Sequence, residues 1–232
     1  MKAPLRAAGA SLVLALAGCS GLRSQAPETV SYLLRAPATA AAASSPSGPL
    51  AAHSLKVVRV VAQPGYDGDR ILLLGADRSL GFYSGSRWVE PLPAVVGTLA
   101  VEALRNAATL RYVLDDTAPF GADYTLRLTI RRFDADYPSA GAPPRITVGF
   151  ACTVARADRS VLENFVVQAE VPASADRMSA VVAAFEQATQ QALGESVQRT
   201  LATLQANVDA TATAPSAANA PLVKPAPPAQ TR

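Results

Sequence analysis

The sequence contains few of the residues that build reactive centres. Its 232 residues include 1 histidine, 2 cysteines and 1 tryptophan. It carries no GxGxxG, P-loop, HExxH or GxSxG motif. This argues against a dinucleotide site, an ATPase site, a zinc-protease centre and a serine-hydrolase nucleophile in this chain. With so few reactive side chains, the sequence predicts a protein that is not an enzyme and binds no cofactor or metal.

A membrane-spanning apolar run is also missing. Ala7 to Ala17 is apolar for about eleven residues, whereas a transmembrane helix needs about 20. Lys2 and Arg6 precede this run and form a short basic region. A basic start followed by a short apolar core is typical of a secretory signal peptide. We therefore expect residues 1–18 to be a signal peptide and not a transmembrane anchor.

The residues around the first cysteine suggest how the signal peptide ends. Leu16-Ala17-Gly18-Cys19 resembles the bacterial lipobox, in which the cysteine thiol receives a diacylglyceryl group before cleavage. Two or three acyl chains hold a protein stably at a membrane, because each buried methylene contributes about 0.8 kcal/mol. Ser20 follows, where aspartate would retain an enteric-type lipoprotein in the inner membrane. The sequence predicts lipidation of Cys19 and placement on the periplasmic face of the outer membrane; an ordinary signal peptide is the alternative.

Neither sign of charge dominates once the signal peptide is removed. The full chain has 21 Lys+Arg and 18 Asp+Glu; losing Lys2 and Arg6 leaves 19 basic residues against 18 acidic ones. A nearly neutral surface lacks the basic footprint of a nucleic-acid-binding protein. We therefore expect no nucleic-acid partner.

Composition divides the remaining chain into four parts. Residues 19–29 are short and polar, and we expect a lipidated tether. Residues 30–205 carry the strand and helix patterns of one domain, interrupted by an Ala/Pro/Ser-rich segment at 36–52 that predicts a flexible loop. Residues 206–232 are rich in alanine and proline and predict a disordered tail.

Apolar periodicity within the domain predicts strands and two helices. Alternating segments, apolar on one face, predict strands with one packed and one wet face. Leu92, Val95, Val96, Leu99 and Ala103 follow helical spacing, and a longer stripe from Met178 to Leu204 predicts a second helix, with Ser174 as its N-cap. The expected strands are 30–34, 55–61, 70–74, 80–84, 111–114, 124–133, 145–155 and 161–171. The fold class is α/β: one mixed or antiparallel sheet with two helices packed on one face.

Three segments of the domain, taken together with their order along the chain, resemble a known family. The stretch "SRWVEPLPAVVGTLAVEALRN" from Ser86 to Asn106 contains Arg87, Trp88, Glu90, Pro91 and Leu92 immediately before a helix. "VSYLLRAP" and "ADYTLRLTIRRFDADY" supply a matching first strand and a later strand. With the lipobox, this pattern resembles the ABC-type transport auxiliary lipoproteins, the PqiC-like family, from about residue 19 to 205.

The resemblance implies a function that composition alone does not show. Such lipoproteins are similar to accessory components of MCE-type lipid transport systems, in which an MCE-domain protein bridges the membranes and an ABC permease and ATPase provide the inner-membrane end. On this reading the chain docks the lipid conduit at the outer membrane. The alternative is an outer-membrane assembly or structural lipoprotein without a transport role. A homo-oligomer is possible on either reading.

Three side chains are candidates for a partner interface. Trp88 either packs against the first helix or anchors a partner, since tryptophan is enriched at interfaces. Arg127 and Arg131 lie with Arg132 on the polar side of an expected strand, and they either face water or meet an acidic partner or phospholipid headgroups.

The remaining polar residues suggest structural roles. His53 lies at the end of the expected flexible loop, a poor frame for catalysis. Asp67 and Asp69 flank Gly68 in a turn. Asp115 and Asp116 follow a strand, and we expect Asp134 and Asp136 to be solvated at a strand end. Cys152, in an alternating apolar segment, is expected to be a buried small side chain.

Overall fold

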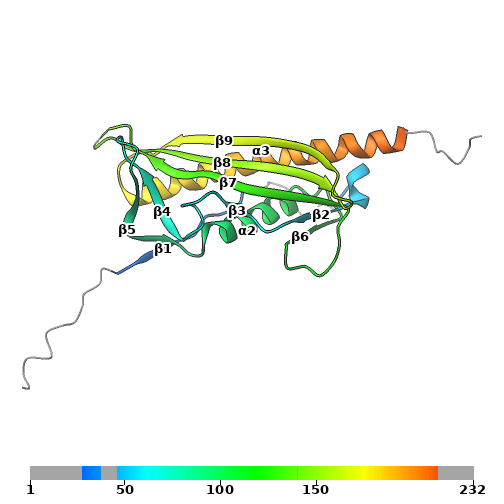
Figure 1. Ribbon diagram of the computed structural model, residues 1–232, viewed down its shortest axis with the longest axis horizontal. Coiled ribbons are helices and arrows are strands. Elements are labelled where there is room, and N and C mark those ends of the chain that lie inside the picture. The colour runs from blue at the N-terminus through cyan, green and yellow to red at the C-terminus, as the bar shows by residue number, and fades with distance from the viewer. Residues whose placement is uncertain (1–27, 38–45, 140, 214–232) are drawn as a thin grey trace, which may run out of the picture.

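The computed structural model describes residues 28–37, 46–139 and 141–213. One sheet and two long helices form two layers, with both helices on the same side of the sheet (Figure 1). This confirms the α/β sandwich predicted from the sequence. The strands are β1 Val30–Tyr32, β2 Ser54–Val57, β3 Val61–Ala62, β4 Arg70–Leu74, β5 Leu80–Trp88, β6 Tyr112–Leu114, β7 Tyr124–Asp136, β8 Arg145–Arg156 and β9 Val161–Pro172.

The sheet is built around β7. One edge of β7 pairs antiparallel with β8, and β8 pairs antiparallel with β9. The other edge of β7 is followed in turn by β2, β3 and β4, all parallel to it. β2 then pairs with β6, and β4 pairs with β5, which pairs with β1. The sheet is therefore mixed, with long antiparallel strands on one side and short parallel strands on the other.

Two α-helices cover the apolar face. Helix α2, Leu92–Asn106, begins after Pro91, where the missing N–H of proline at the first turn costs nothing. Helix α3, Met178–Thr213, packs along β8 and β9. Leu128 and Ile130 of β7, Phe150 of β8 and Phe185 of α3 are fully buried in the shared core.

The strand expected at 55–61 is split into β2 and β3, because residues 58–60 leave the regular pairing with β7. Three further details of the secondary structure differ from the sequence-based expectation. Pro49–Ala52, assigned to a flexible loop, forms the 3-10 helix η2, because the Leu50 side chain inserts into the core and is only 2 % exposed. The N-cap prediction for Ser174 is wrong: α3 begins at Met178, and the carbonyl of Arg177 accepts the first helical hydrogen bonds. Residues 38–45 of the loop lie outside the described residues.

The third difference concerns the start of the tail. Helix α3 continues to Thr213, eight residues into the segment expected to be disordered. Asn207 fixes this extension, since its side-chain oxygen accepts hydrogen bonds from the Tyr124 hydroxyl (3.2 Å) and Arg156 Nε (3.3 Å). Val208 also packs against the core. Residues 206–213 therefore belong to the domain, and 214–232 lie outside the part of the chain that the structure describes.

Candidate functional site

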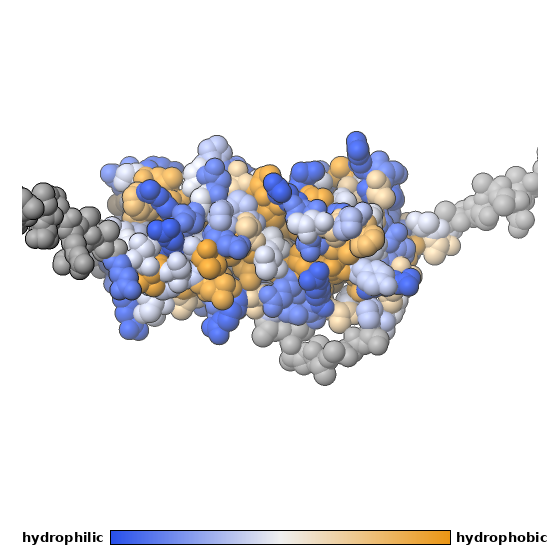
Figure 2. All heavy atoms as spheres, turned by 90° about the horizontal axis from the view of Figure 1, so that it is seen from below, coloured by the Kyte–Doolittle hydropathy of each residue, from blue (hydrophilic) through white to orange (hydrophobic). Residues whose placement is uncertain are grey.

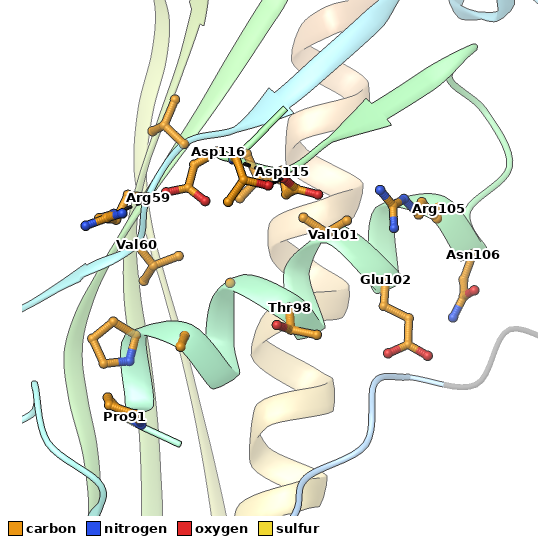
Figure 3. A pocket seen from close by; sticks show the side chains of 16 residues that line it. Arg59, Val60, Pro91, Thr98, Val101, Glu102, Arg105, Asn106, Asp115 and Asp116 are labelled. Atoms are coloured by element: carbon orange, nitrogen blue, oxygen red, sulfur yellow. Dashed lines mark hydrogen bonds and ion pairs between the residues drawn. The ribbon is translucent and has the colours of Figure 1, made fainter. Parts of the chain in front are cut away.

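A groove of about 720 Å³ lies between α2 and the chain segment that joins β2 to β3. Figure 3 shows α2 along one side, with Arg59, Val60, Asp115 and Asp116 across from it and Arg105 and Asn106 at the end of the helix. Figure 2 views the molecule from below, where hydrophobic and hydrophilic residues are interspersed. The lining comprises Val57, Val58, Arg59, Val60, Pro91, Pro93, Ala94, Gly97, Thr98, Val101, Glu102, Arg105, Asn106, Asp115, Asp116 and Thr117.

The floor of the groove is apolar. Val57, Val60 and Val101 are buried, and all three line it. Gly97 is the central position on the helical side: a Cβ there would lie 3.5 Å from Val60 Cγ2. That is ordinary van der Waals contact, so α2 approaches Val60 closely at Gly97. A bulky side chain at this position would have to displace Val60 or extend into the groove beside it.

The rim is charged and mostly self-paired. Arg59 Nε donates to Asp116 Oδ2 at 3.1 Å. The Arg105 guanidinium donates to the carbonyl oxygen of Val113 at 3.2 and 3.0 Å. Hydrogen bonds from the Thr117 hydroxyl and backbone N–H lower the pKa of Asp115, which is therefore ionised at neutral pH. Across the parts of the chain that are described, neither Glu102 nor Asp115 makes an ion pair. Asp115 accepts hydrogen bonds from Thr117, so among the described residues Glu102 is the rim carboxylate without a side-chain partner.

The candidate interface residues predicted from the sequence lie apart from this groove. Trp88 is only 1 % exposed and its ring packs edge-on against Phe133 and Phe185, with centroids 5.8 and 5.3 Å away. Its role is core packing, and its ring offers no surface to a partner. Arg127 and Arg131 are exposed on β7, where a β-bulge between Ile130 and Arg132 leaves Arg131 without a partner in β8.

The expectation that Asp134 is solvated is wrong. Its side chain is 1 % exposed and accepts hydrogen bonds from Arg132 Nη2 at 2.6 Å and from the Tyr66 hydroxyl at 2.8 Å. Tyr66 comes from the loop between β3 and β4, which folds back over the strand and covers the carboxylate. Burial, followed by the hydrogen bond to Asp134, raises the pKa of Tyr66 to about 12. The cluster fixes this loop to the sheet. Asp136 remains partly exposed.

His53 lies beside a serine and an aspartate, but not in a catalytic order. The Ser54 hydroxyl donates directly to Asp123 Oδ2 at 2.8 Å, and His53 Nδ1 lies 3.9 Å from the same oxygen. A nucleophile–base relay requires the serine to bond to the histidine, which this geometry does not provide. His53 is ordered against Tyr124 and not part of a flexible loop, so it is a structural residue.

The two cysteines differ in what the structure shows. Cys152 is buried, as expected, and burial raises the pKa of its thiol to about 11. Cys19 lies outside the described residues, so its lipidation remains a prediction. Among the residues with described positions, no group of three potential metal ligands occurs, and no helix is long and apolar enough to cross a membrane.

The groove itself was not predicted from the sequence. It forms where three distant segments meet, and no local pattern marks that meeting. The one available signal is Gly97, a glycine inside a segment with helical apolar spacing, since such a glycine often has a packing role.

Comparison with known proteins places the chain in a family. The sequence profile of the ABC-type transport auxiliary lipoprotein component matches residues 32–197, most of the domain. Protein XCC0632 from Xanthomonas campestris is 26 % identical over 77 % of this chain and 97 % of its own, with a TM-score of 0.65. A second solved structure, an uncharacterised protein, is 15 % identical over 74 % of this chain and 98 % of its own, with a TM-score of 0.58, and shows the fold alone.

No curated protein matches the chain significantly. The profile match covers more than half of the sequence, and it includes the segment from Arg87 to Leu92 on which the resemblance was based. The chain therefore belongs to the family of ABC-type transport auxiliary lipoprotein components.

Proposed function

We propose that the protein is a non-catalytic accessory component of an MCE-type ABC lipid transport system, held at the periplasmic face of the outer membrane by acyl chains on Cys19. The observation that carries the proposal is the family match over residues 32–197. Its partners are the MCE-domain protein and, through it, the ABC permease and ATPase. The protein docks the lipid conduit and does no chemistry of its own.

The arrangement of polar residues supports a binding role. Cys152 is buried with a raised pKa, and Ser54 bonds to Asp123 and not to His53. The groove beside α2 is accessible and has an apolar floor and a charged rim. Such a surface suits contact with another macromolecule.

Lipidation is tested by substituting the modified cysteine. In cells labelled with radioactive palmitate, Cys19→Ala should abolish labelling and leave the unprocessed precursor. Cys152→Ala is the matched control, because it removes the other thiol and should leave labelling and processing unchanged. Labelling that persists in Cys19→Ala would contradict the lipobox assignment.

The transport role is tested by partner identity. The chain purified from detergent-solubilised envelopes should bring down an MCE-domain protein, and the genes beside its own should encode that protein, a permease and an ATPase. Barrel-assembly components in both places would instead support the alternative, an assembly or structural lipoprotein without a transport role.

A further inference from the structure

Among the strands that the structure describes, β3 leaves one edge unpaired, and the groove opens beside the segment that leads into it. The edge of β7 away from β8 is covered successively by β2, β3 and β4. β2 has a further neighbour in β6, and β4 has one in β5. Within the described ranges β3 has no second neighbour. The row formed by β6 and β5 is therefore interrupted beside Arg59 to Ala62. The groove opens at the start of this interval, beside Arg59 and Val60, and Asp115 to Thr117, which follow β6, form part of its wall.

Backbone groups at this position lack partners. Val58 N–H donates to the Leu126 carbonyl at 3.0 Å and Gln63 N–H donates to the Ile130 carbonyl at 2.9 Å, so both ends of the segment are fixed to β7. Between them, neither the N–H nor the C=O of Arg59 and Val60 bonds to any other described residue. Val60 is 5 % exposed. Arg59 is exposed, so these backbone groups lie at an accessible sheet edge, and such an edge is a template for pairing with another strand.

The chemistry of the groove selects among possible occupants. An acyl chain would contact the apolar floor of Val57, Val60 and Val101, but it would leave the backbone groups unpaired and desolvated. An extended peptide supplies alternating N–H and C=O groups at the spacing of a strand, together with side chains for the floor. The unmatched Glu102 carboxylate on the rim complements a basic side chain.

We propose that this groove is a strand-acceptor site for an extended segment of a partner polypeptide. The segment pairs with Arg59 and Val60 as an added strand in line with β6. It places an apolar side chain against Val60, Gly97 and Val101, and a lysine or arginine near Glu102. The inference concerns how a partner is held, and it stands whichever transport system the partner belongs to.

The test uses the mature chain in detergent and a displayed library of random 12-residue peptides. Peptides that bind should combine alternating apolar residues with a basic one. Gly97→Leu, which adds a bulky side chain beside Val60, should weaken their binding at least tenfold. Gly194→Leu is the matched control: it makes the same change inside α3, where a Cβ meets nothing within 4 Å, and should leave affinity unchanged.

Two measurements then distinguish strand pairing from apolar contact. Hydrogen exchange should slow at least tenfold at the Arg59 and Val60 amides when a selected peptide binds. N-methylation of single peptide residues should abolish binding at every second residue, whose N–H pairs with the sheet, and should be tolerated at the residues between. Failure to obtain a peptide that Gly97→Leu releases, or binding without slower exchange at both amides, would overturn the proposal.

Two other occupants are also outcomes of the experiment. A fluorescent twelve-carbon fatty acid that binds the chain, loses binding in Gly97→Leu and displaces the peptide would identify an acyl-chain site and overturn the proposal. Deletion of residues 214–232 should leave peptide affinity unchanged. A tenfold rise on deletion would show that the chain's own tail occupies the groove, and that no foreign segment is needed.

Discussion

Replacing Trp88 with alanine should cost stability and not partner binding in particular. The indole lies at the centre of an aromatic cluster: Phe133 and Phe185 each meet it edge-on, and these two rings stack on each other with centroids 5.2 Å apart. Trp88 is also the last residue of β5, where its N–H donates to the Asp69 carbonyl at 2.7 Å. Removing the indole leaves a cavity bounded by strand β7 and helix α3.

The expected size of the effect follows from burial. Truncation of a fully buried large aromatic side chain costs about 3–5 kcal/mol. In a domain of this size each kcal/mol lowers the melting temperature by about 2–4 °C, so Trp88→Ala should melt about 6–20 °C below the wild type. Trp88→Phe keeps an aromatic ring in contact with its neighbours and should lose about 1–2 kcal/mol.

The assay is denaturant and thermal unfolding followed by far-ultraviolet circular dichroism, because the variant removes the only tryptophan and with it the fluorescence signal. Val89→Ala is the control. Val89 is 53 % exposed, and its N–H bond to the Tyr32 carbonyl involves only the backbone, so its cost should stay below about 0.5 kcal/mol. A Trp88→Ala chain with an unchanged melting temperature and lost co-purification with its partner would refute the packing argument.

Three further predictions concern the tail, the buried thiol and the ion pair between β9 and α3. Deleting residues 214–232 should leave the melting temperature unchanged, whereas deletion from 207 should lower it by several degrees, because Asn207 bonds to Tyr124 and Arg156; equal melting of both truncations would contradict this. Cys152 should react with a maleimide at pH 8 only in denaturant, since its pKa is raised to about 11 by burial; rapid reaction of the native chain would show local opening. Hydrogen bonds from Thr203 and then Arg199 lower the pKa of Glu163, so its stabilising contribution is present above the ordinary carboxyl pKa and lost as the pH falls through the folded value. Glu163→Gln should therefore reduce the loss of stability on acidification, measured as unfolding midpoints from pH 6 to pH 3, and an unaltered pH profile would contradict the pairing.

Local patterns predicted most elements of this fold. The alternation in 124–133, 145–155 and 161–171 identified the long strands because each presents one face to the helices. The apolar stripe from Leu92 to Ala103 identified α2 for the corresponding reason. Polar residues whose environment depends on a distant segment were harder to predict. Asp134 reads as a solvated strand-end carboxylate until Tyr66 folds over it from another part of the chain.

The candidate site was beyond the reach of sequence patterns for a related physical reason. The groove depends on strand order: β6 ends at Leu114, β5 pairs with β4 and β1, and no described strand fills the position between β6 and β5. Local hydrophobic periodicity does not specify which parallel strands pair. Neither the unfilled strand position nor the unpaired amides of Arg59 and Val60 can therefore be predicted from the sequence pattern.

Strand β1 has a mechanical consequence for a chain tethered at Cys19. It pairs with β5 through three residues, Val30 to Tyr32. Beyond it, Leu34 is buried and the Arg35 guanidinium forms an ion pair with the Glu186 carboxylate at 2.9 Å. A pulling force on the tether would therefore detach residues 28–33 from the sheet before it unfolded the core. The released residues would lengthen the tether by roughly 20 Å, at about 3.3 Å per residue. In a chain lipidated at Cys19 as proposed, detachment of the first strand would lengthen the tether and let the domain move further from the membrane without unfolding its core.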